Sequence, residues 1–311
     1  MIKNIFKTVY TDKHLYGRSR KPEASDIAQG KLGDCYFLAP LGSLAAQQPD
    51  KIQDAIKYDA QTQTFAVTLY GYGPNNQAVP IKVVVDQADL RGDRAIGVDG
   101  TQSHGGDLPL WPEVMECAYA KFSAGVGSKE TIDQELRDIG NGGDPCSVFY
   151  VLTGKDGQAF SADQLRDKQK AFSELHDALQ AHRPVVLNTN GMKDNARDGL
   201  VKGEWSETRR SGHAYMVEAV ALDRRGNVMV TVRNPWGTNA DAAQGVDTNA
   251  PTVQVKLNQI VENGHLNNIE IGPLPAPRPA MVAASNAWAG IPAMAAADPA
   301  PEDDVPAFSM G

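Results

Sequence analysis

The order of hydrophobic and polar positions predicts helices and one hairpin in the first half of the chain. Residues 35–48 are apolar on nearly every side, as in a buried helix, and a short helix is predicted at about 50–57. Residues 64–70 alternate with a period of two, and residues 79–86 are predicted to return as the second strand of a hairpin. Helical spacing resumes at residues 110–122. This half is therefore predicted to be mainly helical.

From about residue 160 the pattern predicts an antiparallel sheet. An amphipathic helix is predicted first, at residues 164–181. The predicted strands that follow it are 184–190, 213–222, 227–234, 252–257 and 268–272. A helical half followed by a half of antiparallel strands predicts an α+β fold with a cleft between the halves.

These patterns divide the chain into four parts. Residues 1–24 are predicted to be an N-terminal extension, residues 25–157 a helical subdomain and residues 158–272 an antiparallel β subdomain. Residues 273–311 contain eight prolines and many alanines. Because such a segment buries too little apolar surface to offset the cost of ordering, we predict that it is a disordered tail.

Composition excludes several classes of protein. The 311 residues are 41% hydrophobic and 22% charged, as in soluble globular proteins, and the net charge of −8 argues against non-specific binding to nucleic acid. No stretch approaches the roughly 20 apolar residues of a membrane span, and the N-terminus lacks the apolar run of a secretory signal. The odd number of cysteines, three, argues against a disulfide framework. We expect a monomer that is cytoplasmic or exported without a cleaved signal.

Cys35 is the first candidate for chemistry. It stands at the predicted start of the buried helix, with Gln29 six residues before it. Most free cysteines are simply buried, which is the interpretation we keep for Cys117 and Cys146. A helix N-terminus carries about half a positive charge, and an adjacent imidazolium would lower a thiol pKa from about 8.5 to roughly 3–4. A nearby amide could stabilise the oxyanion that forms on attack.

His213 and Asn234 are predicted to supply the remaining groups. His213 begins one predicted strand and Asn234 ends the next, so the two residues should lie side by side at one end of a hairpin. An asparagine oxygen there can accept a hydrogen bond from one imidazole nitrogen and direct the other nitrogen at a thiol. Trp236 could shield this bond from water. Alone, His213 would more often be a structural histidine, and the Asn234–Pro235 pair an ordinary turn.

These three segments resemble those of the calpain-type cysteine proteases, which have a papain-like fold. In that family the nucleophile lies in Gln-Gly-x-x-Gly-Asp-Cys-x-x-Leu, the base in Gly-His-Ala-Tyr, and the asparagine in Arg-Asn-Pro-Trp-Gly. All three motifs occur here in the same order, and the resemblance covers about residues 25–272. It implies a calpain-like cysteine endopeptidase that acts on proteins or peptides.

The resemblance also implies a role for each site residue. Cys35 would be the nucleophile, and His213 would be the general base and acid. Asn234 would orient the imidazole of His213. Gln29 would donate to the oxyanion together with the backbone N–H of Cys35. Trp236 would flank the cleft.

A calcium-binding role is implied only by the resemblance to the calpain-type proteases. Calpain cores bind calcium through carboxylates and carbonyls in each half. Asp26, nine residues before Cys35, matches a carboxylate of the first-half site. Its acidic partner would be Glu130 or Glu135, and Glu130 follows a stretch more like the family's. The ordinary alternative is that Asp26 is a turn aspartate and Glu130 a solvated surface acid.

Two other functions stay open at this level. A transglutaminase-like acyltransferase would use the same nucleophile and base, although such enzymes generally have aspartate in place of Asn234. A non-catalytic calpain-like binding module is the other alternative, although such copies usually lack the cysteine or the histidine. Both Cys35 and His213 are present here.

Overall fold

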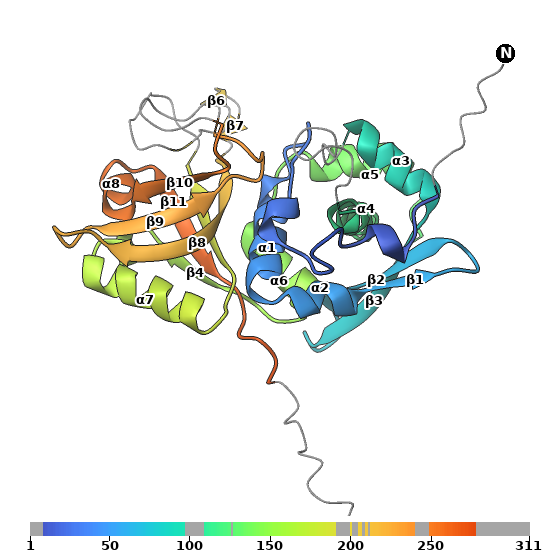
Figure 1. Ribbon diagram of the computed structural model, residues 1–311, viewed down its shortest axis with the longest axis horizontal. Coiled ribbons are helices and arrows are strands. Elements are labelled where there is room, and N and C mark those ends of the chain that lie inside the picture. The colour runs from blue at the N-terminus through green and yellow to red at the C-terminus, as the bar shows by residue number, and fades with distance from the viewer. Residues whose placement is uncertain are drawn as a thin grey trace, which may run out of the picture. The chain divides into compact units, whose positions relative to one another are not determined.

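The structure is a computed structural model (Figure 1). It describes residues 9–96, 109–125, 127–190, 200, 205–206, 209–210, 212–239 and 249–277. The chain divides after Pro275 into two units, and the fold described below belongs to the first. Residues 1–8 of the predicted extension and residues 278–311 of the predicted tail lie outside the described residues, so the disorder of the tail stays a prediction.

The first half is built from helices and a small antiparallel sheet. Its helices are α1 (Cys35–Gln47), α2 (Pro49–Ala55), α3 (Gln87–Ile96), α4 (Trp111–Ala124), α5 (Ile132–Ile139) and α6 (Pro145–Thr153). Its strands, in sheet order, are β1 (Ile56–Asp59), β2 (Thr64–Tyr72) and β3 (Ala78–Val85). Two short 3-10 helices, η1 (Asp12–His14) and η2 (Ala24–Asp26), precede α1.

The second half is dominated by an antiparallel sheet with the order β10-β9-β8-β5-β11-β4. Its strands are β4 (Gln158–Ser161), β5 (Val185–Thr189), β8 (Ala214–Leu222), β9 (Val228–Arg233), β10 (Thr252–Lys256) and β11 (Leu266–Ile271). The long helix α7 (Lys168–Gln180) packs against β5, β8 and β9 (Figure 1). The short elements are η3 (Asp163–Leu165), α8 (Leu257–Glu262) and the paired strands β6 (Trp205–Ser206) and β7 (Arg209–Arg210).

Each half has its own hydrophobic core, and β5 and β8 contribute to both. Successive side chains of a strand point to opposite faces. Val186, Ala214 and Met216 therefore belong to the core around α1, whereas Leu187 and Tyr215 belong to the core around α7. Because this part of the sheet is apolar on both faces, it holds α1 on one side and α7 on the other.

Helix α1 is the element that joins the halves. Its residues from Tyr36 to Ala45 are all buried, as its uniformly apolar sequence predicts. The helix approaches β8 so closely at Gly42 that an added Cβ atom would lie 2.3 Å from the Sδ atom of Met216. At the next residue, the Ser43 hydroxyl donates to the carbonyl of Val185 at 2.9 Å. The first residue of α1 is thus placed beside the sheet of the second half.

The predicted α+β architecture is confirmed, and the differences from prediction are local. The helix predicted at 164–181 begins only at Lys168, because the Asp167 side chain caps it by accepting from the N–H groups of Gln169 and Lys170. Helices α3, α5 and α6 and strands β1 and β4 were not predicted. Within the described residues, no helix is both long and apolar enough to cross a membrane.

Candidate active site

Cys35 is the first residue of α1, at the end of the helix where backbone N–H groups are free. The residue is partly exposed. Burial raises the thiol pKa to about 11; a hydrogen bond with the backbone of Ala214 opposes this shift, and the nearby Asp34 carboxyl adds to it. The bond to Ala214 matters most for the site, because Ala214 directly follows His213. The fold therefore brings the predicted nucleophile and the predicted base together.

His213 and Asn234 form the pair that their positions in the sequence predict. The Nε2 atom of His213 lies 2.8 Å from the Oδ1 atom of Asn234, and both residues are buried. The Oδ1 atom can only accept, so Nε2 carries the hydrogen and Nδ1 keeps a free lone pair. Thr189 fixes the backbone of His213: its hydroxyl accepts from the His213 N–H at 2.9 Å.

Two aromatic rings enclose the imidazole of His213. The ring of Trp236 lies 4.8 Å from it, centroid to centroid, at 48°, and the ring of Tyr215 lies at 4.8 Å and 87°. This burial lowers the pKa of His213 to about 4, against the opposing effect of the bond to Asn234. A base that is neutral at neutral pH can accept a proton from a thiol.

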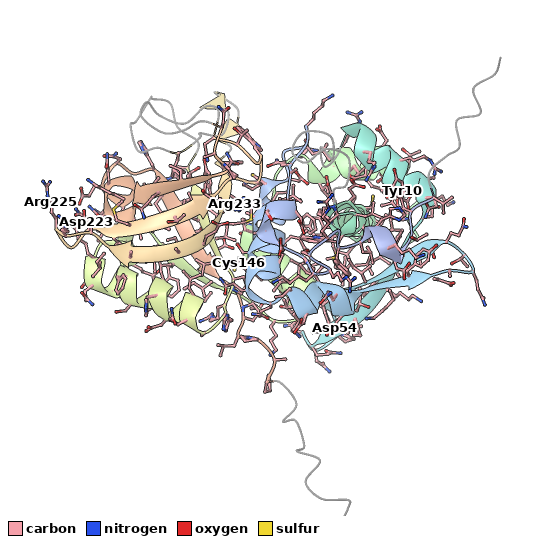
Figure 2. The ribbon with its side chains drawn as sticks, in the orientation of Figure 1. Tyr10, Asp54, Cys146, Asp223, Arg225 and Arg233 are labelled. Carbon is pink, nitrogen blue, oxygen red and sulfur yellow. The ribbon has the colours of Figure 1, made fainter. Side chains whose placement is uncertain are left out.

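The ends of the hairpin explain how these residues meet. Figure 2 shows Asp223 and Arg225 at the tip of the β8–β9 hairpin, while Arg233 lies at the opposite end of β9, toward α1. Asn234 follows Arg233 directly, and Met216 of β8 pairs with Arg233. His213 and Asn234 are therefore at the end of the sheet that faces the start of α1.

Gln29 lies at the same place. Its backbone N–H donates to the carbonyl of Pro235 at 2.8 Å, which links the loop before α1 to the loop that carries Asn234. Its side-chain Nε2 donates to the carbonyl of Leu32 at 2.6 Å, and the residue is only 8% exposed. The structure thus gathers Gln29, Cys35, His213, Asn234 and Trp236 from three separate segments.

The conformation differs from the expected ion pair of thiolate and imidazolium. With a thiol pKa of about 11 and an imidazole pKa of about 4, both groups are neutral around pH 7. His213 is not among the groups that shift the Cys35 pKa most. The expected lowering of the thiol pKa was therefore wrong for this conformation, because burial without a neighbouring positive charge favours the neutral thiol.

The residues matched to calcium do not form a cation site in this conformation. The Asp26 carboxylate accepts from the indole Nε1 of Trp111 at 2.7 Å and from the N–H of Glu23 at 2.9 Å. Glu130 is exposed. Its negative charge contributes to the raised pKa of Glu135, after the larger effect of burial. Across the described ranges, no three His, Cys, Asp or Glu side chains are grouped so that they could hold a metal. The Asp26 carboxylate is thus already bonded within the protein in this conformation, and the metal role of Asp26 and Glu130 stays a prediction.

Sequence reasoning missed three residues that surround the site. Thr189 holds the backbone of His213, Asp34 is a fully buried carboxyl group directly before Cys35, and Glu116 of α4 is a second fully buried carboxyl group. A signal for Glu116 was present, since it interrupts the apolar pattern of a helix whose residues from Trp111 to Ala120 are all buried.

Comparison with known proteins agrees with this geometry. Residues 7–249 match the family described as "Calpain family cysteine protease". The calpain-2 catalytic subunit of Gallus gallus is 26% identical over 256 residues, which cover 77% of this chain and 33% of the relative. Calpain-9 of Mus musculus is 25% identical over 227 residues (68% and 28%), and the calpain-1 catalytic subunit of Rattus norvegicus is 26% identical over 219 residues (68% and 27%). The chain thus matches about a third or less of the length of these relatives. With the family matched over most of its length and the α+β fold in place, the chain belongs to the calpain family of cysteine proteases and has its papain-like fold.

Proposed function

We propose that this chain is a cysteine endopeptidase that hydrolyses peptide bonds in proteins or peptides. The observation that carries the proposal is the alignment of three groups. The imidazole of His213 is bonded to Asn234 through Nε2, and the next residue, Ala214, is bonded through its backbone to the sulfur of Cys35. These two contacts support a triad of nucleophile, base and orienting group.

The chemistry follows from these contacts. His213 Nδ1 takes the thiol proton as the Cys35 sulfur attacks the peptide carbonyl carbon, and a C–S bond forms. The oxyanion that results is stabilised by the Cys35 backbone N–H and by the side-chain N–H of Gln29. The C–N bond then breaks as the imidazolium protonates the leaving amine. Water, activated by the same imidazole, hydrolyses the thioester and restores the thiol.

Neutral groups at rest do not prevent this sequence of steps. The thiol loses its proton as it attacks, so a resting thiolate is not required. Asn234 keeps the hydrogen on Nε2, which leaves the lone pair of Nδ1 to take the thiol proton. Calcium has no part in the mechanism proposed here.

Covalent labelling tests the proposal with a matched control inside the chain. Cys146 is partly exposed like Cys35, and its thiol pKa is also raised to about 11 by burial. Cys146 has no triad, however. A peptidyl epoxide should therefore label Cys35 and leave Cys146 unmodified, as peptide mapping by mass spectrometry would show. Equal labelling of both cysteines, or of neither, would contradict the assignment of Cys35 as nucleophile.

Substrate assays then separate hydrolysis from acyl transfer. We expect the protein to cleave an unfolded protein substrate such as casein, and Cys35→Ala to abolish cleavage while Cys146→Ala retains it. Incorporation of a primary amine into glutamine side chains without cleavage would favour the transglutaminase-like alternative. If the substrate is neither cleaved nor modified in these two assays, the result would favour the non-catalytic binding module and contradict the endopeptidase.

A further inference from the structure

The last residue of β5 is bonded to His213 in a way that a regular sheet does not produce. In the antiparallel pair of β5 and β8, Asn188 lies opposite Ala214. The next residues to face each other are Thr189 and His213, and in a regular hydrogen-bonded pair they would exchange two N–H···O=C bonds. The Thr189 N–H does donate to the His213 carbonyl, at 2.9 Å. The reciprocal bond is made differently.

The side-chain hydroxyl of Thr189 takes the place of its backbone carbonyl. Its Oγ1 atom accepts from the His213 N–H at 2.9 Å and lies 3.3 Å from the His213 carbonyl, to which it donates. A hydroxyl can make both bonds, because it has one O–H and two lone pairs. The carbonyl oxygen of Thr189 lies against Gly212 instead, so closely that a Cβ atom added there would be 1.8 Å away.

The backbone of His213 therefore depends on one side chain. Thr189 and His213 are only 2% and 4% exposed. Without the hydroxyl, the His213 N–H would be a buried donor that lacks this acceptor, and such a donor is costly to leave unpaired. Relief of that cost would require the backbone of His213 to shift.

Thr189 is itself firmly held on its other side. It pairs with Leu266 of β11. The N–H of the next residue, Asn190, donates to the carbonyl of His265 at 2.9 Å. The end of β5 is thus fixed to the start of β11, and a group held by the strands of a sheet is placed more precisely than one on a loop.

His213 is consequently held from both neighbours of β8. The sheet order places β8 between β9 and β5. The backbone of His213 is bonded to Thr189 at the end of β5, and its Nε2 atom is bonded at 2.8 Å to Asn234, which follows β9. An imidazole has two torsions between its ring and its backbone. Fixing the backbone and Nε2 therefore fixes the ring.

We propose that Thr189 is a positioning residue for the base: its hydroxyl fixes the backbone of His213 to β5, so that the imidazole stays bonded to Asn234 with Nδ1 free. Under the proposed function, on which this inference rests, Nδ1 takes the proton of the thiol. Thr189 is buried and acts only through His213.

The nitrogen signals of His213 test this proposal by NMR without any need for peptidase activity. In protein labelled with ¹⁵N in its histidines, the signal that is lost in His213→Gln identifies this residue. We expect the wild type to show a single tautomer with the hydrogen on Nε2. Thr189→Val keeps the shape of the side chain without the hydroxyl, so the ring should become mobile and both nitrogens should show averaged shifts. Thr189→Ser keeps the hydroxyl and should retain the wild-type signals.

Peptide hydrolysis measures the consequence for the reaction. In Thr189→Val we expect kcat to fall by about 10- to 100-fold, because a displaced base transfers protons less efficiently, while KM stays nearly unchanged. Thr189→Ser should restore most of kcat.

Thr153→Val is the matched control. The Thr153 hydroxyl also accepts from a backbone N–H, that of Lys155 at 3.2 Å, and donates to a carbonyl, that of Phe149 at 2.6 Å. It does so at the end of α6, in the first half of the fold. This variant should keep the wild-type kcat and the wild-type signals of His213. Circular dichroism checks that each variant is folded.

The outcomes separate this proposal from the proposed function. Thr189→Val with wild-type signals or a wild-type kcat, or Thr189→Ser as disturbed as Thr189→Val, would overturn the positioning role even if the protein cleaves peptides. If Thr189→Val does not fold, hydrogen exchange of the His213 amide in the wild type replaces it: slow exchange supports the bond, and exchange as fast as that of an exposed amide overturns it. Conversely, the expected signals in a protein that cleaves no peptide would support the positioning of His213 and contradict the endopeptidase.

Discussion

The Nε2 atom of His213 lies 2.8 Å from the Oδ1 atom of Asn234, although the two residues are 21 positions apart in the chain. Each stands just outside a strand of the same antiparallel pair, His213 before β8 and Asn234 after β9. The distance is therefore set by the pairing of the two strands. This bond determines which imidazole nitrogen is free to act on the Cys35 thiol.

Removing the Asn234 side chain should impair catalysis more than stability. In Asn234→Ala the Nε2 hydrogen loses its acceptor and the imidazole loses its fixed orientation. A lost hydrogen bond of about 1–3 kcal/mol corresponds to a fall in kcat/KM of roughly 5- to 150-fold. Asn239→Ala is the control, since Asn239 contacts the Nδ2 atom of Asn234 at 3.5 Å but not His213. Equal losses in both variants, measured by peptide hydrolysis, would argue against an orienting role.

The burial of His213 should make the fold sensitive to acid. Its folded pKa of about 4 lies below the ordinary value of 6.5, so the unfolded chain takes up a proton first as the pH falls. Stability from this group is complete above pH 6.5 and is lost between about pH 6.5 and 4, by at most about 3 kcal/mol. His213→Gln should weaken this loss. Thermal midpoints at pH 7.5 and pH 5 would check it; identical pH dependence in both proteins would contradict it.

The carboxyl of Asp34 should have the opposite effect over a similar pH range. Burial raises its pKa from 3.8 to about 7, so the folded chain holds a proton that the unfolded chain has released. This group therefore makes the fold less stable as the pH rises from about 4 to 7. We expect Asp34→Asn to raise the thermal midpoint relative to wild type more at pH 8 than at pH 5. A gain that does not change with pH would mean that Asp34 does not titrate in this range.

Asp26 should act as a structural acid in the absence of calcium. Its carboxylate bonds the buried indole N–H of Trp111 at 2.7 Å, and Trp111 is 0% exposed. Asp26→Ala should therefore lower the free energy of unfolding by about 1–3 kcal/mol. We expect the same loss with and without added calcium. If calcium raised the thermal midpoint of the wild type but not that of Asp26→Ala, Asp26 would be a ligand after all.

A second measurement identifies the partner of Asp26. Trp111→Phe removes the indole N–H but keeps an aromatic ring in the core. If the bond to Trp111 is what Asp26 contributes, the effects of Asp26→Ala and Trp111→Phe on unfolding should not add in the double variant.

Several elements of this fold were predictable from local patterns. Helix α1 is apolar all round and lies buried, and β2 alternates with a period of two and has one buried face. Helix α6 was missed although its signals were present: Asp144 at the N-cap, Pro145 at the first turn, and Gly154 with φ +70° after its end. Helices α3 and α5 are short and mostly polar, which hid them, although α5 carried a helical signal: Thr131 caps its N-terminus, and Leu136 and Ile139 are buried on one face.

By itself, the sequence determined which residues are available for chemistry and the order in which they follow one another. Cys35 at a helix start, and His213 and Asn234 at strand ends, depend on local periodicity and on motifs, which neighbouring residues encode. The tertiary structure alone decided the contacts that set their protonation. Burial favours the neutral forms of the Cys35 thiol and the His213 imidazole, and the Asp26 carboxylate bonds the indole of Trp111. These effects depend on desolvation and on partners more than 80 positions away, neither of which a local pattern contains.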